Sequence, residues 1–253
     1  MTQTVVMHGE AAPAGASQDT VHARHHPSDF QPVAVSRICV HTSMAEIEQE
    51  WRTFEKDAAC TVFQTFSWLA AWLRHAGQLR GVAPCIVTGR DSNGALAFIL
   101  PLAAETRGHI RRLVWLGCDQ CDYNAPIASA AFLRDDGPAC FRALWPEIVS
   151  GIQRKLGARI DLVDLDKMPD SIDGHVNPVT GLNVFDHPSG AHIATLGESW
   201  ESFYAAKRSA PTRKNERKKL RYLAGYGNIR AIDASATAER ALTMDILIEQ
   251  KKR

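Results

Sequence analysis

Residues 85–104 read CIVTGRDSNGALAFILPLAA, a stretch with a clear strand–turn–strand pattern. Two apolar runs, Cys85–Arg90 and Ala95–Ala104, flank the polar tetrapeptide Asp91–Gly94. Asn-Gly is a strong hairpin signal because both residues tolerate positive φ. The stretch therefore predicts two antiparallel strands, from which the rest of the fold can be worked out in both directions.

A strand over Val33–Val40 and two helices are predicted before the hairpin. Ser43 and Glu46 form a capping box, in which each side chain accepts a hydrogen bond from the other residue's exposed backbone N–H, so the first helix starts at Met44. The apolar face of that helix recurs at helical spacing. It comprises Met44, Ile47, Trp51, Phe54 and Ala58.

The second helix is expected over Ser67–His75, with Gly77 as its C-terminal stop. Trp68 and Trp72 lie on one side of this helix, together with two leucines. Large aromatic side chains on one helix face are typical of core packing. We expect both tryptophans in the core.

Strands and a helix also follow the hairpin. Arg112–Leu116 is a third strand beside it, and Ile160–Leu165 is a further strand with acidic residues spaced along it. Apolar residues at helical spacing from Phe141 to Leu156 predict a helix between them. Pro146 is expected to kink or restart that helix.

Composition divides the chain into three parts. Residues 1–34 are rich in Ala, Gly, Pro and Ser and are expected to be a disordered tail, whose histidines have no assigned role. Residues 35–185 are expected to form one domain, and the Pro- and Gly-rich segment 169–190 contains the boundary. Residues 190–253 start a second, incomplete unit.

The second unit alternates strands and helices as the first does. Short strands are expected at His192–Leu196 and Asn228–Ile232, and helices at Trp200–Lys207, Pro211–Ala224 and Ala236–Arg253. The fold class is therefore α/β (α+β), with a mixed sheet flanked by helices.

The overall composition excludes several classes of protein. The chain has 253 residues, of which 45% are hydrophobic, enough for a packed core. No apolar run approaches the roughly 18–20 residues of a membrane helix, and the N-terminus has no signal-peptide pattern, so a cytoplasmic location is expected. A net charge of +1 argues against nucleic-acid binding by the chain as a whole.

The loop Leu116–Pro126, after the third strand, contains two competing chemistries. Cys118 and Cys121 form a CxxC, typical of a redox couple or half a zinc site. No second CxxC accompanies them, and the residues after them start a helix poorly, so we expect neither a redox centre nor a metal. The six cysteines are instead expected to be free thiols in largely apolar surroundings.

Acidic and phenolic groups make up the other chemistry of this loop. Asp119, Asp122 and Tyr123 are suited to proton transfer at the end of a strand, where α/β folds tend to bind ligands. The structural alternative is that Asp122 and Tyr123 fix a turn through backbone hydrogen bonds and packing. Both interpretations are open at this point.

The helix predicted near residues 211–224 is strongly basic. Arg213 and Arg217 share one face, and Lys214 and Lys218 share another, so the helix presents two rows of cations. These rows suit an anionic ligand such as coenzyme A phosphates, a sugar nucleotide or RNA, although a solvated helix face is the simpler interpretation. Nucleic acid is not the expected partner, because only two tyrosines accompany the cations.

The chain resembles the acyltransferases of the GNAT superfamily, in particular the cellulose-biosynthesis (CelD/BcsL-type) acetyltransferase family. The resemblance covers roughly residues 37–253 and rests on the order of several motifs. These are Trp51 with its helix, Thr61–Trp72, Leu100-Pro-Leu102, Leu113–Gly117, Asp122–Pro126, Trp200, and the Arg/Lys-rich helix ending near Gly227.

This resemblance implies two GNAT-like units in tandem, the second incomplete, and transfer of an acyl group from acetyl-CoA or another acyl-CoA. The acceptor would be an amine or hydroxyl on a small molecule or on a saccharide such as an exopolysaccharide precursor. It places Asp122, Tyr123 and Asp119 near the acceptor, and Arg213, Lys214, Arg217 and Lys218 near the donor. The basic helix thus becomes the expected acyl-CoA site.

One motif of that superfamily has no clean match. A Gln/Arg-x-x-Gly-x-Gly/Ala loop holds the donor pyrophosphate in such enzymes, whereas Arg154–Gly157 is followed by Arg159, and Gly225-Tyr-Gly227 follows a helix. A chain with the acceptor half but no donor site would be inactive alone. The alternatives are a non-catalytic binding or scaffold module and an RNA-binding protein with a basic helix.

Overall fold

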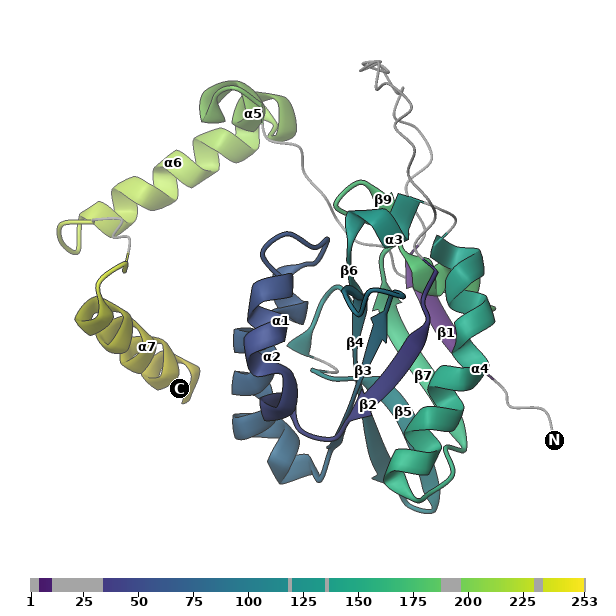
Figure 1. The fold of residues 1–253 in the computed structure, drawn as a ribbon. Coiled ribbons are helices and arrows are strands. Elements are labelled where there is room, and N and C mark those ends of the chain that lie inside the picture. The colour runs from purple at the N-terminus through teal and green to yellow at the C-terminus, as the bar shows by residue number, and fades with distance from the viewer. Residues whose placement is uncertain are drawn as a thin grey trace, which may run out of the picture. The chain divides into compact units, whose positions relative to one another are not determined.

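A computed structural model describes residues 5–10, 34–117, 120–134, 137–187, 197–229 and 234–252. The chain forms two compact units, Met1–His192 and Ile193–Arg253. The first unit contains a mixed sheet flanked by helices, which confirms the predicted fold class (Figure 1). The division lies close to the predicted boundary.

The predicted hairpin lies in the antiparallel part of this sheet. β3 (Ala83–Arg90) pairs with β4 (Leu96–Arg107), and the Asp91 carboxylate accepts hydrogen bonds from two backbone N–H groups of the turn, Asn93 and Ala95, each at 2.9 Å. Gly94 has a φ of +84°, but Asn93 does not have a positive φ. The turn thus needs a left-handed backbone only at Gly94. The hydrogen bonds to Asp91 stabilise it in place of a second left-handed residue.

Both neighbours of the hairpin are antiparallel to it. β2 (Arg37–His41), which starts four residues later than predicted, pairs with β3. β5 (Ile110–Trp115) pairs with β4 on the other side, as predicted from Arg112–Leu116. The strand order from this edge is β2-β3-β4-β5.

The other half of the sheet is parallel. β7 (Leu162–Met168) pairs with β5, β1 (Val5–Glu10) pairs with β7, and β10 (Phe185–His187) pairs with β1. Strand β7 was predicted as Ile160–Leu165, whereas β1 and β10 were not predicted. The expectation of a disordered tail over residues 1–34 is therefore wrong for residues 5–10. The backbone hydrogen bonds of this short segment come from parallel pairing to strands far away in the sequence. The residues near the segment in sequence therefore give no signal from which the strand could be predicted.

Two apolar clusters cover opposite faces of the sheet. α1 (Glu48–Phe54) and α2 (Phe66–Trp72) lie over one face, while α4 (Gly137–Leu156) lies over the other (Figure 1). Side chains of β4 alternate between the clusters, with Phe98 packed toward α4 and Ile99 toward α1 and α2. This alternation follows from the two-residue repeat of a strand, and it makes β4 the centre of both layers.

Helix α4 continues through Pro146, so of the two expected effects of this proline the restart is wrong. A proline removes one helical hydrogen bond and crowds the preceding turn. Burial of apolar side chains against the sheet on both sides of Pro146 offsets that cost. They include Phe141, Trp145, Ile148 and Ile152.

The start of the first helix follows its predicted capping box. The Ser43 backbone N–H donates to Glu46 Oε1 at 3.1 Å, and the Ser43 hydroxyl accepts from the backbone of the first turn. This turn, Met44–Ile47, is 3-10 in geometry and leads into α1. The cap therefore fixes the point after β2 at which the chain turns into α1.

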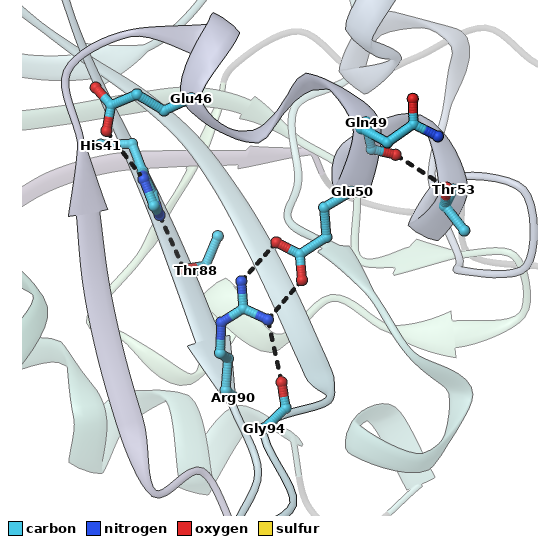
Figure 2. Close-up of polar contacts among 8 residues, drawn as sticks. All are labelled: His41, Glu46, Gln49, Glu50, Thr53, Thr88, Arg90 and Gly94. Carbon is cyan, nitrogen blue, oxygen red and sulfur yellow. Dashed lines mark hydrogen bonds and ion pairs between the residues drawn. The ribbon is translucent and has the colours of Figure 1, made fainter.

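An ion pair fastens α1 to the hairpin. Arg90 at the end of β3 donates two hydrogen bonds to the Glu50 carboxylate, each at 2.5 Å, and a third to the Gly94 carbonyl at 3.1 Å (Figure 2). Hydrogen bonding to Arg90 lowers the pKa of Glu50, against partial burial, which raises it. The ionised carboxylate of Glu50, bound to Arg90, thus stabilises the contact between α1 and the turn of the hairpin.

The edge of β4 that faces β5 is shared between two strands. β5 pairs with Leu102–Arg107, whereas the short β6 (Ile127–Ala128) pairs with Phe98 and Ile99. Pro101 lies between these two stretches, and its carbonyl accepts a hydrogen bond from the Leu116 N–H at 2.9 Å. A proline has no N–H to offer in return, so the ladder is interrupted at this point.

The segment 169–190 contains more structure than predicted. β8 (Ser171–Ile172) and β9 (His175–Val176) form a small hairpin, and a 3-10 turn at Pro178–Gly181 packs against α4. Arg142 donates to the Gly181 carbonyl. Another short element, α3 (Ala130–Arg134), follows β6 and was not predicted.

The described part of the second unit consists of three helices. α5 (Trp200–Lys207), α6 (Ala210–Ala224) and α7 (Thr237–Lys252) match the helices predicted there within one residue. Of the two predicted strands, His192–Leu196 lies outside the described residues. Asn228 and Ile229 have no regular structure, and residues 230–232 also lie outside the described residues.

We predict that the Glu50–Arg90 pair contributes a coupling energy of about 0.5–1 kcal/mol in a double-mutant cycle of Glu50→Gln and Arg90→Gln. The Glu48–Arg52 pair on the same helix is the matched control, since both of its side chains are at least 40% exposed. We expect a smaller coupling there, about 0.3–0.5 kcal/mol. Urea unfolding of the four variants of each cycle measures both.

The pH dependence of this coupling follows from the lowered pKa of Glu50. Because the folded-state pKa lies below the unfolded value of about 4.3, the stabilisation is complete above that pH and is lost as pH falls through the folded-state pKa. The difference between wild type and Glu50→Gln should therefore be constant near neutrality and shrink below about pH 4. A constant difference down to pH 2 would contradict this assignment.

Candidate functional site

The loop that follows β5 lies where the two parallel strands end. β5 and β7 run in the same direction and pair through Arg112–Leu162 and Leu113–Val163, so their carboxyl ends meet at one edge of the sheet. Open α/β sheets bind ligands at the carboxyl ends of parallel strands. The loop Leu116–Pro126 is thus in a favourable place for a site, as its sequence predicted.

Three hydrogen bonds tie this loop to the end of β7. The Asn124 N–H donates to the Lys167 carbonyl at 2.8 Å, and the Asn124 side chain donates to the Asp166 carbonyl at 3.1 Å. The Lys167 ammonium group donates to the Cys121 carbonyl at 3.1 Å. Lys167 has a φ of +53°, a conformation that costs a non-glycine residue free energy and that these contacts maintain.

Contacts from the helical layer hold the other side of the loop. The buried Gln64 side chain donates to the Tyr123 carbonyl at 2.6 Å, and its own backbone carbonyl accepts from the Trp51 indole N–H at 3.2 Å. The Phe63 ring lies 6.1 Å from the Tyr123 ring. The loop is therefore fixed from both layers, which is the arrangement that a preorganised site requires.

The loop presents two of the three predicted catalytic residues toward solvent. Asp122 is exposed, and its carboxylate makes no hydrogen bond or ion pair with another described residue. Tyr123 is half-buried against Phe63. The backbone of Tyr123 fixes the turn, as the structural alternative required, whereas the side chain of Asp122 is not used in this way. Asp119 lies outside the described residues.

Cys121 behaves as a core residue. Its side chain is fully buried, and burial raises the pKa of the thiol to about 11. A thiol that is protonated at neutral pH is a poor nucleophile and a poor metal ligand. Its CxxC partner, Cys118, lies outside the described residues. Among the residues that are described, no group of three His, Cys, Asp or Glu side chains is placed to hold a metal ion.

A charged cluster formed by side chains of β4, β5 and β7 was not predicted from the sequence. The Arg112 guanidinium contacts Glu105 at 2.8 Å and also pairs with Asp164, and the Glu105 carboxylate further contacts Arg107 at 3.1 Å. Together with Asp166 these groups surround a hollow of about 50 Å³. The acidic residues spaced along β7 were the one visible signal, but sequence alone could not pair them with Arg112.

A larger pocket adjoins the loop. It has a volume of about 370 Å³, within the usual range for small-ligand sites. It is lined by Trp68, Trp72, His75, Arg80 and Gln120, with two alanines among them. Trp72 is buried as predicted, but Trp68 is 38% exposed, so the expectation that both tryptophans belong to the core is wrong for Trp68.

A carboxylate–imidazole–hydroxyl array lies at the edge of the sheet, away from this pocket. His41 lies between Glu46, at 3.3 Å from Nδ1, and the Thr88 hydroxyl, at 3.2 Å from Nε2 (Figure 2). The pattern resembles a nucleophile relay. Thr88 is fully buried, however, so a substrate cannot reach its hydroxyl. The array links β2, β3 and the first helical turn.

The predicted donor-binding cations lie on α6, in the second unit. Arg213 is half-buried and donates to the Ala205 carbonyl of α5 at 3.0 Å, so it helps to join the two helices. Lys214 and Arg217 are exposed. Lys218 lines an open hollow of about 360 Å³ together with Asn215, Lys219, Tyr222 and Leu223. The helix therefore offers a cationic surface with an apolar floor, but not all four cations face it.

Comparison of the chain with protein-family models, with curated proteins and with solved structures finds no match. The resemblance to GNAT acyltransferases therefore stays a prediction. Within the described ranges, no helix is long and apolar enough to cross a membrane.

We predict that Gly117→Ala disorders the loop and destabilises the first unit. Gly117 has a φ of +102°, and a Cβ there would overlap Cys121 Sγ and lie 3.0 Å from Leu69 Cδ2. Gly108→Ala is the matched control, because Gly108 also has a positive φ, +63°, but has open space around it. We expect about 1 kcal/mol for the control and about 2–4 kcal/mol for Gly117→Ala by urea unfolding. Equal losses would show that the loop does not pack as described.

Proposed function

We propose that the chain belongs to an acyltransferase that moves an acyl group, most simply acetyl, from acyl-CoA to an amine or hydroxyl acceptor. The observation that carries this proposal is the position of Asp122 and Tyr123. They are neighbours on a loop that is fixed from both sides, at the carboxyl ends of two parallel strands. A carboxylate beside a phenol supplies a proton acceptor and a proton donor.

The proposed reaction uses these two groups in turn. Asp122 accepts a proton from the acceptor hydroxyl or neutral amine as the acceptor's oxygen or nitrogen attacks the thioester carbonyl. The new carbon–oxygen or carbon–nitrogen bond forms, and the carbon–sulfur bond breaks. Tyr123 donates a proton to the departing thiolate, and solvent exchange returns both groups to their starting states.

The remaining elements of the proposal are the cations of α6 and the location. Lys214, Arg217 and Lys218 are suited to phosphate groups of the donor, while Arg213 is engaged with α5. A saccharide-related acceptor and a cytoplasmic location stay predictions from the sequence. A non-catalytic binding module is the alternative, and it requires neither Asp122 nor Tyr123.

We expect release of free thiol from acetyl-CoA, measured with a thiol reagent, to fall about 10²–10⁴-fold in Asp122→Asn. Tyr123→Phe should show a smaller fall, because water can replace a proton donor better than a positioned base. Asp57→Asn is the matched control, since Asp57 is an exposed aspartate on the same unit, outside the site. Activity that survives in Asp122→Asn would remove Asp122 from the mechanism.

A thermal-shift titration with acetyl-CoA separates the enzyme from the scaffold alternative. A ligand that binds only the folded chain raises the unfolding temperature, and the rise grows with the ratio of ligand concentration to its Kd. We expect such a rise in the wild-type chain and a smaller one in the double variant Lys214→Gln/Lys218→Gln. The absence of any rise, together with the absence of thiol release, would favour a non-catalytic module.

A further inference from the structure

The pocket beside the loop, lined by Trp68, Trp72, His75, Arg80 and Gln120, combines an aromatic surface with a cation and an amide. Trp68, Trp72 and His75 recur four and three residues apart, so they lie along one face of α2 and the turn that follows it. Ala71, which lies between the two tryptophans in sequence, also lines the pocket. The pocket is therefore built mainly from one continuous segment of chain.

The local backbone makes this arrangement rigid. Leu73–Gly77 forms a π-helical turn, a rare geometry that is often found at functional sites. A Cβ at Gly77 would lie 2.7 Å from the Trp72 ring, so only glycine lets the indole pack against this turn. The Trp68 ring is supported by an edge-to-face contact with Phe63 at 5.4 Å. Both indoles are thus held before any ligand arrives.

The polar groups of the pocket come from two other segments. Arg80 lies on the 3-10 turn Gln78–Arg80, and Glu105 of β4, 4.0 Å from its guanidinium, orients it. Gln120 belongs to the same loop as Asp122 and Tyr123. His75 is exposed at the rim. The described lining carries Arg80 and His75 but no carboxylate. Glu105, which pairs with Arg80, lies outside this lining and also contacts Arg107 and Arg112, so an anion can still be attracted to Arg80.

We propose that this pocket binds an adenine nucleotide. Planar bases stack on indole faces, a contribution of about 1–3 kcal/mol per base. A glutamine amide offers one donor and one acceptor, which match N7 and the exocyclic amine of adenine. A guanidinium binds phosphate through paired N–H groups. Trp68, Gln120 and Arg80 supply these three interactions in a single pocket.

Two sources share this chemistry: a free adenine nucleotide, and the phosphoadenosine end of coenzyme A. The second source rests on the proposed function, because it would hold the acyl donor in the first unit, next to the loop with Asp122. It would also place the adenine end of the donor in this pocket and not on the cations of α6, the other candidate for the donor's phosphates. Nucleotide binding itself depends only on the pocket.

Calorimetric titration of the full chain with AMP, GMP, adenosine and ribose phosphate tests the proposal. We expect AMP to bind at least about tenfold more tightly than adenosine, which lacks the phosphate, or ribose phosphate, which lacks the base. AMP should also bind more tightly than GMP, and Gln120→Ala should remove that preference. No AMP binding, or equal binding of AMP and adenosine, would overturn the proposal.

Variants locate the binding site. Trp68→Ala and Arg80→Gln should each weaken AMP binding about tenfold, without loss of the folded state in thermal unfolding. The matched controls are Trp200→Ala, an exposed tryptophan in the other unit, and Arg74→Gln, an exposed arginine of the same π-helical turn that does not line the pocket. AMP binding that Trp68→Ala and Arg80→Gln leave unchanged would exclude this pocket.

Competition separates the two sources. Displacement of AMP by coenzyme A, lost in Trp68→Ala, would support the donor end as the ligand, whereas AMP binding without displacement would overturn that identification. If AMP binds as expected and no thiol is released from acetyl-CoA, the proposed function fails and nucleotide binding stands. If thiol is released and AMP does not bind, the nucleotide proposal fails and the acyltransferase stands.

Discussion

The missing N–H of Pro101 is the constraint on which the arrangement of this protein depends. In an antiparallel ladder the N–H and C=O of one residue point to the same neighbour, and the Pro101 carbonyl points to Leu116. Pro101 therefore interrupts pairing on the β5 side of the central strand. β5 ends there, and β6 takes the next positions, through Ile127 opposite Ile99. The loop between them leaves and rejoins the sheet at nearly the same point.

A loop that is hydrogen-bonded to the sheet at both ends can be rigid without regular secondary structure of its own. Asn124 attaches it to β7, and Gln64 attaches it to the helical layer. Gln120 of this loop lines the pocket together with the indoles of Trp68 and Trp72 and with Arg80. Arg80 in turn contacts Glu105 of the sheet. The same constraint thus accounts for the position of the proposed acid–base pair and for the pocket next to it.

Local signals were sufficient for much of this fold. The capping box at Ser43, the turn at Asp91, the strand before the loop and the three helices of the second unit all depend on residues close in sequence. Nonlocal features were missed. β1 is a strand only because β7 and β10 pair with it, and α4 continues through Pro146 only because the sheet buries its apolar face.

The candidate site shows the same limit. Its loop could be placed from the sequence because it follows an apolar strand, and Asp122 could be singled out by residue type. Trp68 was assigned to the core because helical spacing alone does not show where the neighbouring layer ends. Arg80 and Glu105 lie on different elements, so only the folded chain brings them together. The acyltransferase chemistry stays a prediction that rests on resemblance and on the position of the loop.

Amide hydrogen exchange, followed residue by residue in the full chain, measures whether the sheet holds the loop Leu116–Pro126 in place. If the loop is clipped to the sheet at Pro101 and β7, the N–H groups of Leu116 and Asn124, which donate to Pro101 and Lys167, should exchange as slowly as those of β4 and β5. Fast exchange of both amides, while β4 and β5 stay protected, would show that the loop is not held by the sheet and would contradict this account.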